Sequence, residues 1–389
     1  MKLLILAFVS ILSCSKDDDK IIGIEKDKIF RSPVYLQNPS TDGMTIMWQT
    51  NVPCHSWVEY GTDSLNMQQA QSWVRGIAMV NNTLNRIRLT GLEPGTRYYY
   101  RVCSREVISY LSNEKVFGET ATSKVSAFST FDDKQTDFTA LIFNDLHNDY
   151  YSVFNRLLRQ VTDISYDIVF FNGDCVEDPK TEDAAISIIS KYSKGIGADL
   201  VPSVYVWGNH EYWGAYSPFL SNLLGMMDGG YSYGSFNIGD TRFVILDCGV
   251  DLSDDASIYQ GLNNFAQYHK DQAEFLRKEV ATEKFMSAAK RVLIHHIPIY
   301  GVPERPIHPS RVEWGSILEE APFDICLNAH IHGPLRYVPK GTAKNNYPVV
   351  FGGGSSEKNA YIMILRKQGD QMTLTARNVN GEILLSLEF

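Results

Sequence analysis

The feature that most constrains this chain is a set of five short clusters of His, Asp and Asn, each of which follows an apolar run. The clusters are Asp145-Leu-His147, Gly173-Asp174, Gly208-Asn209-His210-Glu211, His295-His296-Ile-Pro298 and His330-Ile-His332. The apolar runs cover residues 139–143, 168–171, 202–207, 292–294 and 325–327, and their lengths are typical of buried strands. Functional sites of open α/β sheets are built in the loops beyond the carboxyl ends of the strands. The pattern therefore predicts an α/β domain whose clusters meet at one edge.

The residue types in these clusters indicate a site for two metal ions. Six of the nine histidines lie in them, together with hard oxygen ligands from Asp and Asn. Two ions a few ångströms apart need about eight protein ligands, one of them a carboxylate that both ions share. A single Gly-Asp pair is more often a turn than a ligand, and a single GNHE could cap a helix or form an Asx turn. Five clusters in this order, each behind a strand, favour metal binding.

In the order DxH, GD, GNHE, HxP and HxH, residues 138 to 365 resemble the calcineurin-like metallophosphoesterases, a superfamily that includes the purple acid phosphatases. The resemblance implies a four-layer αββα sandwich that hydrolyses phosphate esters with a water molecule activated by two divalent or trivalent ions. The metal ligands that it implies are Asp145, His147 and His332 for the first ion, Asn209, His296 and His330 for the second, and Asp174 as the bridge. It also implies that His210 is the catalytic residue and not a ligand. Such a site accepts Fe, Mn or Zn.

Two positions depart from the purple acid phosphatases. Their GDxxY motif places a tyrosinate on iron, whereas Glu177 stands at that position here, and His147 stands where their first motif commonly has Gly. The ligand lost at Glu177 is regained at His147, as in the non-purple members, so we expect a colourless site. In the superfamily the ligand lies two residues before Pro, here Pro298, which selects His296. His295 is then a strand residue or a partner of the ligands.

The N-terminus reads as a secretion signal that ends at a cysteine. Lys2 precedes an apolar run over residues 3–12, which is shorter than the roughly 20 residues that span a bilayer. Ile11-Leu-Ser-Cys14 resembles a bacterial lipobox, and the acidic residues that follow resemble an export tag. We expect a lipoprotein signal peptide over residues 1–14, an acidic tether over 15–28, and a surface-exposed outer-membrane lipoprotein of a Gram-negative bacterium, anchored by a lipid on Cys14. The alternative is an ordinary signal peptide with a coincidental cysteine.

Residues 29–122 show short strand-like runs separated by turn signals, which predicts an all-β sandwich of the fibronectin type III or immunoglobulin kind. Residues 44–49, 58–61 and 89–98 resemble the N-terminal domain of purple acid phosphatases, with Trp48 in its core. Residues 123–137 are expected to be a linker, and residues 138–389 the catalytic domain, whose last strands complete a second sheet. A disulfide framework is not expected, but one bridge between Cys54 and Cys103 stays open.

The remaining residues bear on the substrate. A net charge of −9 without a basic stripe disfavours a nucleic-acid partner and leaves a small phosphate ester. Tyr212 and Trp213 follow His210 directly and either form a wall of the pocket or pack on neighbouring loops. His308 lies in a Pro-rich segment that could cover the site. His55 and His269 are expected to be surface histidines.

Three functions are compatible with the sequence. The first is a cell-surface phosphomonoesterase that resembles the acid phosphatases. The second is a phosphodiesterase or nucleotide hydrolase with the same site, because one metal pair serves both reactions. The third, from another class, is an adhesion or glycan-binding surface lipoprotein with a vestigial phosphatase domain, and the intact ligand set weighs against it.

Overall fold

The apolar runs before the five clusters all form strands in the computed structural model, which describes residues 23–302 and 309–389. These strands are β10 (Phe138–Asn144), β11 (Ile168–Asn172), β12 (Ser203–Val206), β15 (Lys290–Ile294) and β16 (Ile325–Leu327). β10, β11 and β12 are parallel neighbours in one sheet, and β15 and β16 are parallel neighbours in another. Parallel strands end at the same edge, so the clusters meet there. Cys14, the signal-like segment and His308 lie outside the described residues.

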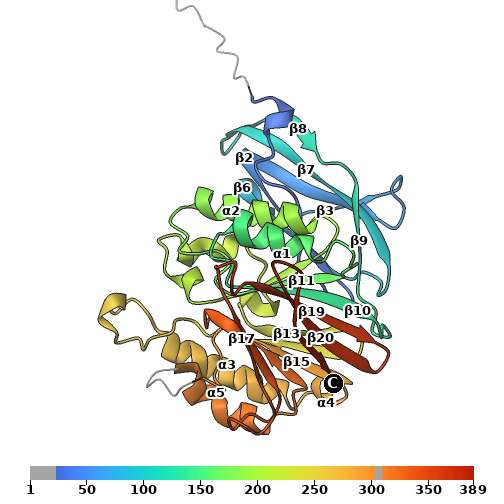
Figure 1. Ribbon diagram of the computed structural model, residues 1–389. Coiled ribbons are helices and arrows are strands. Elements are labelled where there is room, and N and C mark those ends of the chain that lie inside the picture. The colour runs from blue at the N-terminus through green and yellow to red at the C-terminus, as the bar shows by residue number, and fades with distance from the viewer. Residues whose placement is uncertain (1–22, 303–308) are drawn as a thin grey trace, which may run out of the picture.

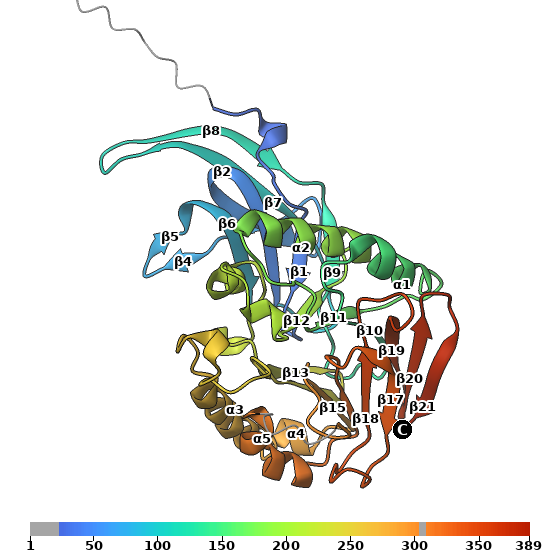
Figure 2. The same cartoon turned by 60° about the vertical axis from the view of Figure 1, so that its left-hand side comes forward.

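Two sheets face each other in the C-terminal part of the chain (Figures 1 and 2). Here the first sheet has the order β21-β20-β19-β10-β11-β12, and the second has the order β13-β14-β15-β16-β18-β17. The strands not yet given are β13 (Gly234–Ile238), β14 (Thr241–Ile245), β17 (Gly333–Val338), β18 (Val349–Gly353), β19 (Tyr361–Gln368), β20 (Gln371–Asn378) and β21 (Ile383–Glu388). An apolar core fills the space between the sheets and includes Ile142 and Phe170 from one and Phe243 and Ile294 from the other.

The expectation that all the last strands complete the second sheet is wrong. Only β17 and β18 join that sheet, whereas β19 pairs antiparallel with β10 and brings β20 and β21 into the first. The change of sheet follows β18, where Gly352, Gly353 and Gly354 have φ of 121°, 104° and 132°. Residues with a Cβ rarely adopt such angles, so this glycine run permits the redirection of the chain.

Helices cover the outer faces of both sheets and complete the four layers (Figure 2). α1 (Asn155–Arg159) and α2 (Glu182–Ile196) lie on the first sheet, and α3 (Phe265–Glu279), α4 (Glu283–Met286) and α5 (Pro309–Glu320) lie on the second. Alternation along the strands explains this arrangement, because Leu141 and Val169 face α2 while their neighbours Ile142 and Phe170 face the other sheet. The αββα sandwich expected from the sequence is therefore confirmed.

Residues 29–122 form strands without a helix, as expected, and a short 3-10 helix, η1 (Lys26–Lys28), precedes them. The strands of the N-terminal part are β1 (Tyr35–Gln37), β2 (Met44–Gly61), β3 (Gln68–Ala70), β4 (Trp73–Val74), β5 (Ile77–Ala78), β6 (Val80–Leu89), β7 (Arg97–Tyr110), β8 (Lys115–Thr122) and β9 (Ser126–Ser129). Trp48 is buried in the core and donates a hydrogen bond to Ser104 Oγ at 2.9 Å. The strand β9 lies within the segment expected to be a linker and pairs with β7, so the irregular part of that segment is shorter than expected.

One strand joins the two parts of the chain. β1 pairs antiparallel with β2 and parallel with β12, where Gln37 faces Ser203, so a single sheet runs through both parts. Tyr100 OH adds a hydrogen bond to Asp199 O at 2.8 Å. The five cysteines of the described residues, Cys54 and Cys103 among them, are free thiols. Within residues 23–302 and 309–389 no helix has the length and apolar character needed to cross a membrane.

Candidate metal centre

Loops at the carboxyl ends of five strands carry the clustered residues into one site. Asp145 and His147 follow β10, Asp174 follows β11, and the other clusters follow β12, β15 and β16. Asp145, His147, Asp174 and His330 have φ of 48°, 45°, 52° and 66°. Few residues with a Cβ adopt this left-handed conformation, and such strain gathers at functional sites where the surroundings enforce it. Four of the expected ligands are therefore held in uncommon backbone conformations.

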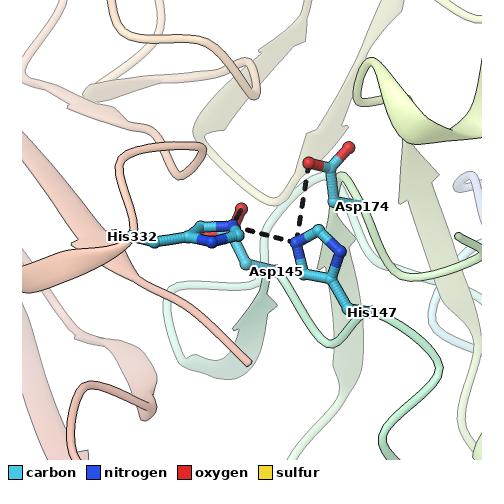
Figure 3. Close-up of side chains that lie close together, drawn as sticks. All are labelled: Asp145, His147, Asp174 and His332. Carbon is cyan, nitrogen blue, oxygen red and sulfur yellow. Dashed lines mark hydrogen bonds and ion pairs between the residues drawn. The ribbon is translucent and has the colours of Figure 1, made fainter. Parts of the chain in front are cut away.

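The first group of side chains able to hold a metal ion consists of Asp145, His147, Asp174 and His332 (Figure 3). His147 Nε2 lies 2.9 Å from His332 Nε2, and 3.8 Å from Asp174 Oδ2. His332 Nε2 lies 3.4 Å from Asp145 Oδ1. Two ring nitrogens this close need a proton or a cation between them. The group contains the three residues expected around the first ion and the expected bridge.

The second group consists of Asp174, His296 and His330, so Asp174 belongs to both. His296 is fully buried, and its Nε2 lies 3.1 Å from Asp174 Oδ2, the distance of an ion pair. Asn209 Oδ1 is also buried and accepts no hydrogen bond. Buried polar atoms are nearly always hydrogen-bonded, so an amide oxygen without a donor, next to an imidazole nitrogen that faces a carboxylate, fits a metal site.

The hydrogen bonds of the rings favour metal binding at Nε2. His296 Nδ1 lies 3.0 Å from the carbonyl oxygen of Asn172, which can only accept, so Nδ1 carries a proton. His147 Nδ1 likewise lies 3.1 Å from Glu177 Oε1. The lone pair of each neutral ring is then at Nε2 and faces carboxylates. Burial lowers the pKa of His296, but the charges of Asp174 and Asp145 outweigh it and raise the pKa to about 10. These side chains therefore fit a bound cation, and a proton on His296 can take the place of that cation.

His210 lies beside these groups. Its backbone N–H donates to Asp174 Oδ1 at 2.9 Å, and its ring centroid lies 4.9 Å from that of His147. Its Nδ1 lies 2.9 Å from Asp178 Oδ1. This contact fixes the orientation of the ring and leaves Nε2 as the ring nitrogen that can contact a substrate. His147, Glu177 and His210 form a third group compact enough for an ion. We favour the other two, because carboxylates already bind the Nδ1 atoms of His147 and His210.

Glu211 holds two of the loops together and was not recognised from the sequence. Its buried carboxylate accepts four backbone N–H bonds of 2.9 Å, from Asp174, Cys175, Val176 and Gly208. These donors come from the loops after β11 and β12. Burial and the charge of Asp174 raise the pKa of Glu211 to about 7, against the opposing effect of the backbone bonds. The signal in the sequence was its place in the GNHE cluster.

Two glycines permit the close approach of the ligand loops. A Cβ at Gly173 would lie 2.1 Å from His296 Nδ1, and a Cβ at Gly208 would lie 2.3 Å from Asp174 Oδ1. Both distances are far below a van der Waals contact. The glycines of the GD and GNHE clusters are therefore required by packing around Asp174 and His296.

Two other histidines lie behind the site. His295 is buried between Cys248 Sγ and Cys326 Sγ at 3.5 and 3.4 Å, and burial lowers its pKa to about 3, so it is neutral. It belongs to none of the metal groups found among the described residues. The surface position expected for His269 is wrong. His269, Gln272 and Leu276 share the helical spacing of the buried face of α3, and His269 Nε2 bonds to Cys248 O at 2.8 Å.

A pocket of about 1020 Å³ is lined by Asp178 and Trp213, two side chains that contact the His210 ring. Tyr212 and Trp213 both line it. Tyr212 also packs against Trp207 and donates a hydrogen bond to Asp247. Tyr212 therefore both forms part of the pocket wall and packs on neighbouring segments, the two alternatives expected from the sequence. The contact of Tyr212 and Trp213 with substrate stays a prediction.

Comparison with known proteins defines the family of this arrangement. Residues 138–334 match the sequence profile of the calcineurin-like phosphoesterases. The chain belongs to the calcineurin-like phosphoesterase family. Residues 31–130 of this phosphoesterase match the purple acid phosphatase N-terminal domain. The resemblance noted in the sequence is thus confirmed, and the chain is a phosphoester hydrolase.

Two solved structures share the fold of this phosphoesterase. The purple acid phosphatase PPD1 from yellow lupin (Lupinus luteus) seeds is 16% identical with a TM-score of 0.67, and the match covers 91% of this chain and 73% of that one. PhoD is 13% identical with a TM-score of 0.62, and the match covers 92% and 89%. None of the curated proteins matches this chain in sequence. At these identities the structural matches speak for the fold alone.

Proposed function

We propose that this phosphoesterase is a metal-dependent phosphomonoesterase that acts on a small phosphate ester. The observation that carries the proposal is the position of Asp174, which belongs to two adjacent groups of His and Asp side chains. Two bound ions, Fe, Mn or Zn, would activate a water molecule for attack on phosphorus and neutralise charge on the phosphate oxygens. Asp145, His147 and His332 would hold one ion, Asn209, His296 and His330 the other, and Asp174 both.

The remaining chemistry is assigned to residues beside the ions. His210 would donate a proton to the leaving oxygen from Nε2, because its Nδ1 is engaged by Asp178 at 2.9 Å. Asp178 would keep the ring in that orientation. Glu211 would keep the loops of Asp174 and Asn209 in register through its four backbone bonds.

Support for the monoester over the diester comes from the N-terminal part, which matches the purple acid phosphatase N-terminal domain over residues 31–130. The test is hydrolysis of para-nitrophenyl phosphate against bis(para-nitrophenyl) phosphate, with metal analysis of the same sample. Faster turnover of the monoester is expected. A preference for the diester would support a phosphodiesterase, and absence of both metal and turnover would support a vestigial domain in a surface-binding protein.

We propose further that a lipid on Cys14 anchors the enzyme in the outer membrane with its catalytic part at the cell surface. Support comes from the lipobox-like Ile11-Leu-Ser-Cys14 and the acidic residues after it. Cells that produce the native chain should incorporate labelled fatty acid into it, whereas Cys14→Ala should not be labelled. External protease should remove the native protein from intact cells. A labelled Cys14→Ala chain or full protection from protease would contradict the proposal.

A further inference from the structure

The pocket beside His210 adjoins the place where a leaving group is protonated. Its wall includes Asp178, whose carboxylate binds His210 Nδ1 at 2.9 Å. It also includes Trp213, whose ring centroid lies 4.5 Å from that of His210. A general acid contacts the leaving oxygen at hydrogen-bond distance. The alcohol that carries this oxygen therefore lies against the same wall.

The lining of the pocket is mainly apolar, with six aromatic side chains, and its uncharged polar side chains include Ser217, Asn263 and Asn264. Its residues include Trp213, Tyr259, Phe265, Tyr268, Ile258 and Leu262. Among the described residues that line it, none has a positive charge, and Asp178 is the one carboxylate. A second phosphate or a carboxylate on the alcohol would lose its hydration there without gaining a counter-charge. An uncharged ring would instead gain apolar contacts.

The rim of the pocket leaves two large apolar side chains in solvent. Ile258 is 68% exposed and Leu262 is 87% exposed. Their loop is attached to the start of α3, because the Asp254 carboxylate accepts the N–H groups of Phe265 at 2.9 Å and Ala266 at 2.8 Å. Ile258 and Leu262 are therefore presented next to the pocket on an anchored loop, where a bound ring would cover them.

We propose that this pocket binds the alcohol part of the substrate, and that this alcohol is uncharged and carries an aromatic ring system. The volume of about 1020 Å³ is at the upper end of sites for drug-sized ligands and exceeds what one ring fills, so fused or extended rings fit best. The inference rests on the proposed function, because it concerns the ester that the metal site would cleave.

The test uses ethyl, benzyl and naphthylmethyl phosphate with the metal-loaded full chain. All three esters release primary alcohols of similar intrinsic reactivity, so differences in kcat/KM report on the pocket. We expect kcat/KM to rise about tenfold or more from ethyl to naphthylmethyl phosphate, from the apolar surface that a ring system buries. Ile258→Ser combined with Leu262→Ser should abolish most of this rise, so that kcat/KM of the variant is similar for all three esters.

A matched control is Ile77→Ser combined with Leu65→Ser, whose side chains are 68% and 89% exposed in the N-terminal part. The control should keep the native preference. A flat series in the native enzyme, or a preference that survives in the pocket variant, would overturn the inference.

A binding measurement separates this inference from the proposed function. Calorimetric titration with naphthylmethanol, which has no phosphate, should show binding to the native chain and to the control, and about tenfold weaker binding to the pocket variant. If none of the three phosphates is hydrolysed, the proposed function fails, and the titration still decides the pocket. Equal binding to all variants, or none to the native chain, would overturn the pocket assignment.

Discussion

Metal binding should displace a proton from His296. This ring is fully buried, with Nδ1 bonded to Asn172 O and Nε2 3.1 Å from Asp174 Oδ2. Burial opposes its charged form, but the carboxylates of Asp174 and Asp145 raise its pKa to about 10. At pH 7 the ring therefore carries a proton at the atom that a metal ion needs.

The size of this competition follows from the pKa. A pH of 7 is about three units below the His296 pKa of about 10, and each unit corresponds to about 1.4 kcal/mol of free energy. Protonation therefore weakens apparent metal binding by about 4 kcal/mol at pH 7. The apparent affinity of the second ion should rise about tenfold per pH unit as the pH increases from 6 to 9.

Isothermal titration calorimetry checks this competition between the proton and the metal ion by counting the protons released. Metal-free protein is titrated with Mn(II) at pH 7 in two buffers that differ in their heat of ionisation, and the difference gives the protons released. The native chain should release at least one proton with the second ion, and His296→Asn should lose that release. His55→Asn, which alters a histidine of the N-terminal part, should behave as the native chain. Binding of two ions to the native chain with no proton released would refute the reasoning.

Three further variants test the surroundings of the site. Asp178→Asn removes the charge that orients His210, so kcat should fall about tenfold or more while KM and metal content, measured on the same sample, stay native; unchanged kcat would contradict that role. Glu211→Gln places an NH₂ group against backbone N–H donors, so the free energy of unfolding in urea should fall by about 2 kcal/mol or more and metal should be lost. Glu274→Gln, on the exposed side of α3, is its control, and equal effects would count against the loop-holding role. Burial raises the pKa of Asp247 to about 6, against about 4 in the unfolded chain, so ionisation of Asp247 should lower the free energy of unfolding by about 3 kcal/mol as pH rises from about 3 to 7. Asp247→Asn should flatten that part of the stability profile in the presence of a chelator, and an unaltered profile would contradict the assignment.

The residues at the ends of the strands could be predicted from the sequence because two local signals coincide there. A short apolar run fixes the strand, and the polar cluster after it marks the edge of the sheet, as for β10 with Asp145 and β11 with Asp174. Parallel pairing then brings distant clusters together without further information. The two groups that share Asp174 follow from this logic and from the family motifs.

The partners of these residues could not be predicted in the same way. Glu177 and Asp178 are adjacent in sequence, yet Glu177 contacts His147 and Asp178 contacts His210. Asp178 has φ of 43°, and this local conformation helps decide which carboxylate meets which ring. No pattern in the amino-acid sequence predicts this backbone conformation.

The other features that the sequence did not predict depend on contacts between distant segments. β19 is apolar enough for either sheet, and its antiparallel pairing with β10 decides the matter. His269 lies in a polar stretch, but its position on α3 relative to Gln272 and Leu276 turns it toward the core. In both cases the side chain types were compatible with two environments, and packing against a distant segment selected one.

The central claim, that Asp174 joins two metal positions of one hydrolytic site, is tested most directly by a metal titration of activity. Metal-free protein is titrated with Mn(II) while the hydrolysis of para-nitrophenyl phosphate is followed. The rate should be negligible without metal and should reach its plateau at two equivalents of Mn(II) per chain. Hydrolysis that is independent of metal, or that is complete at one equivalent, would contradict the account.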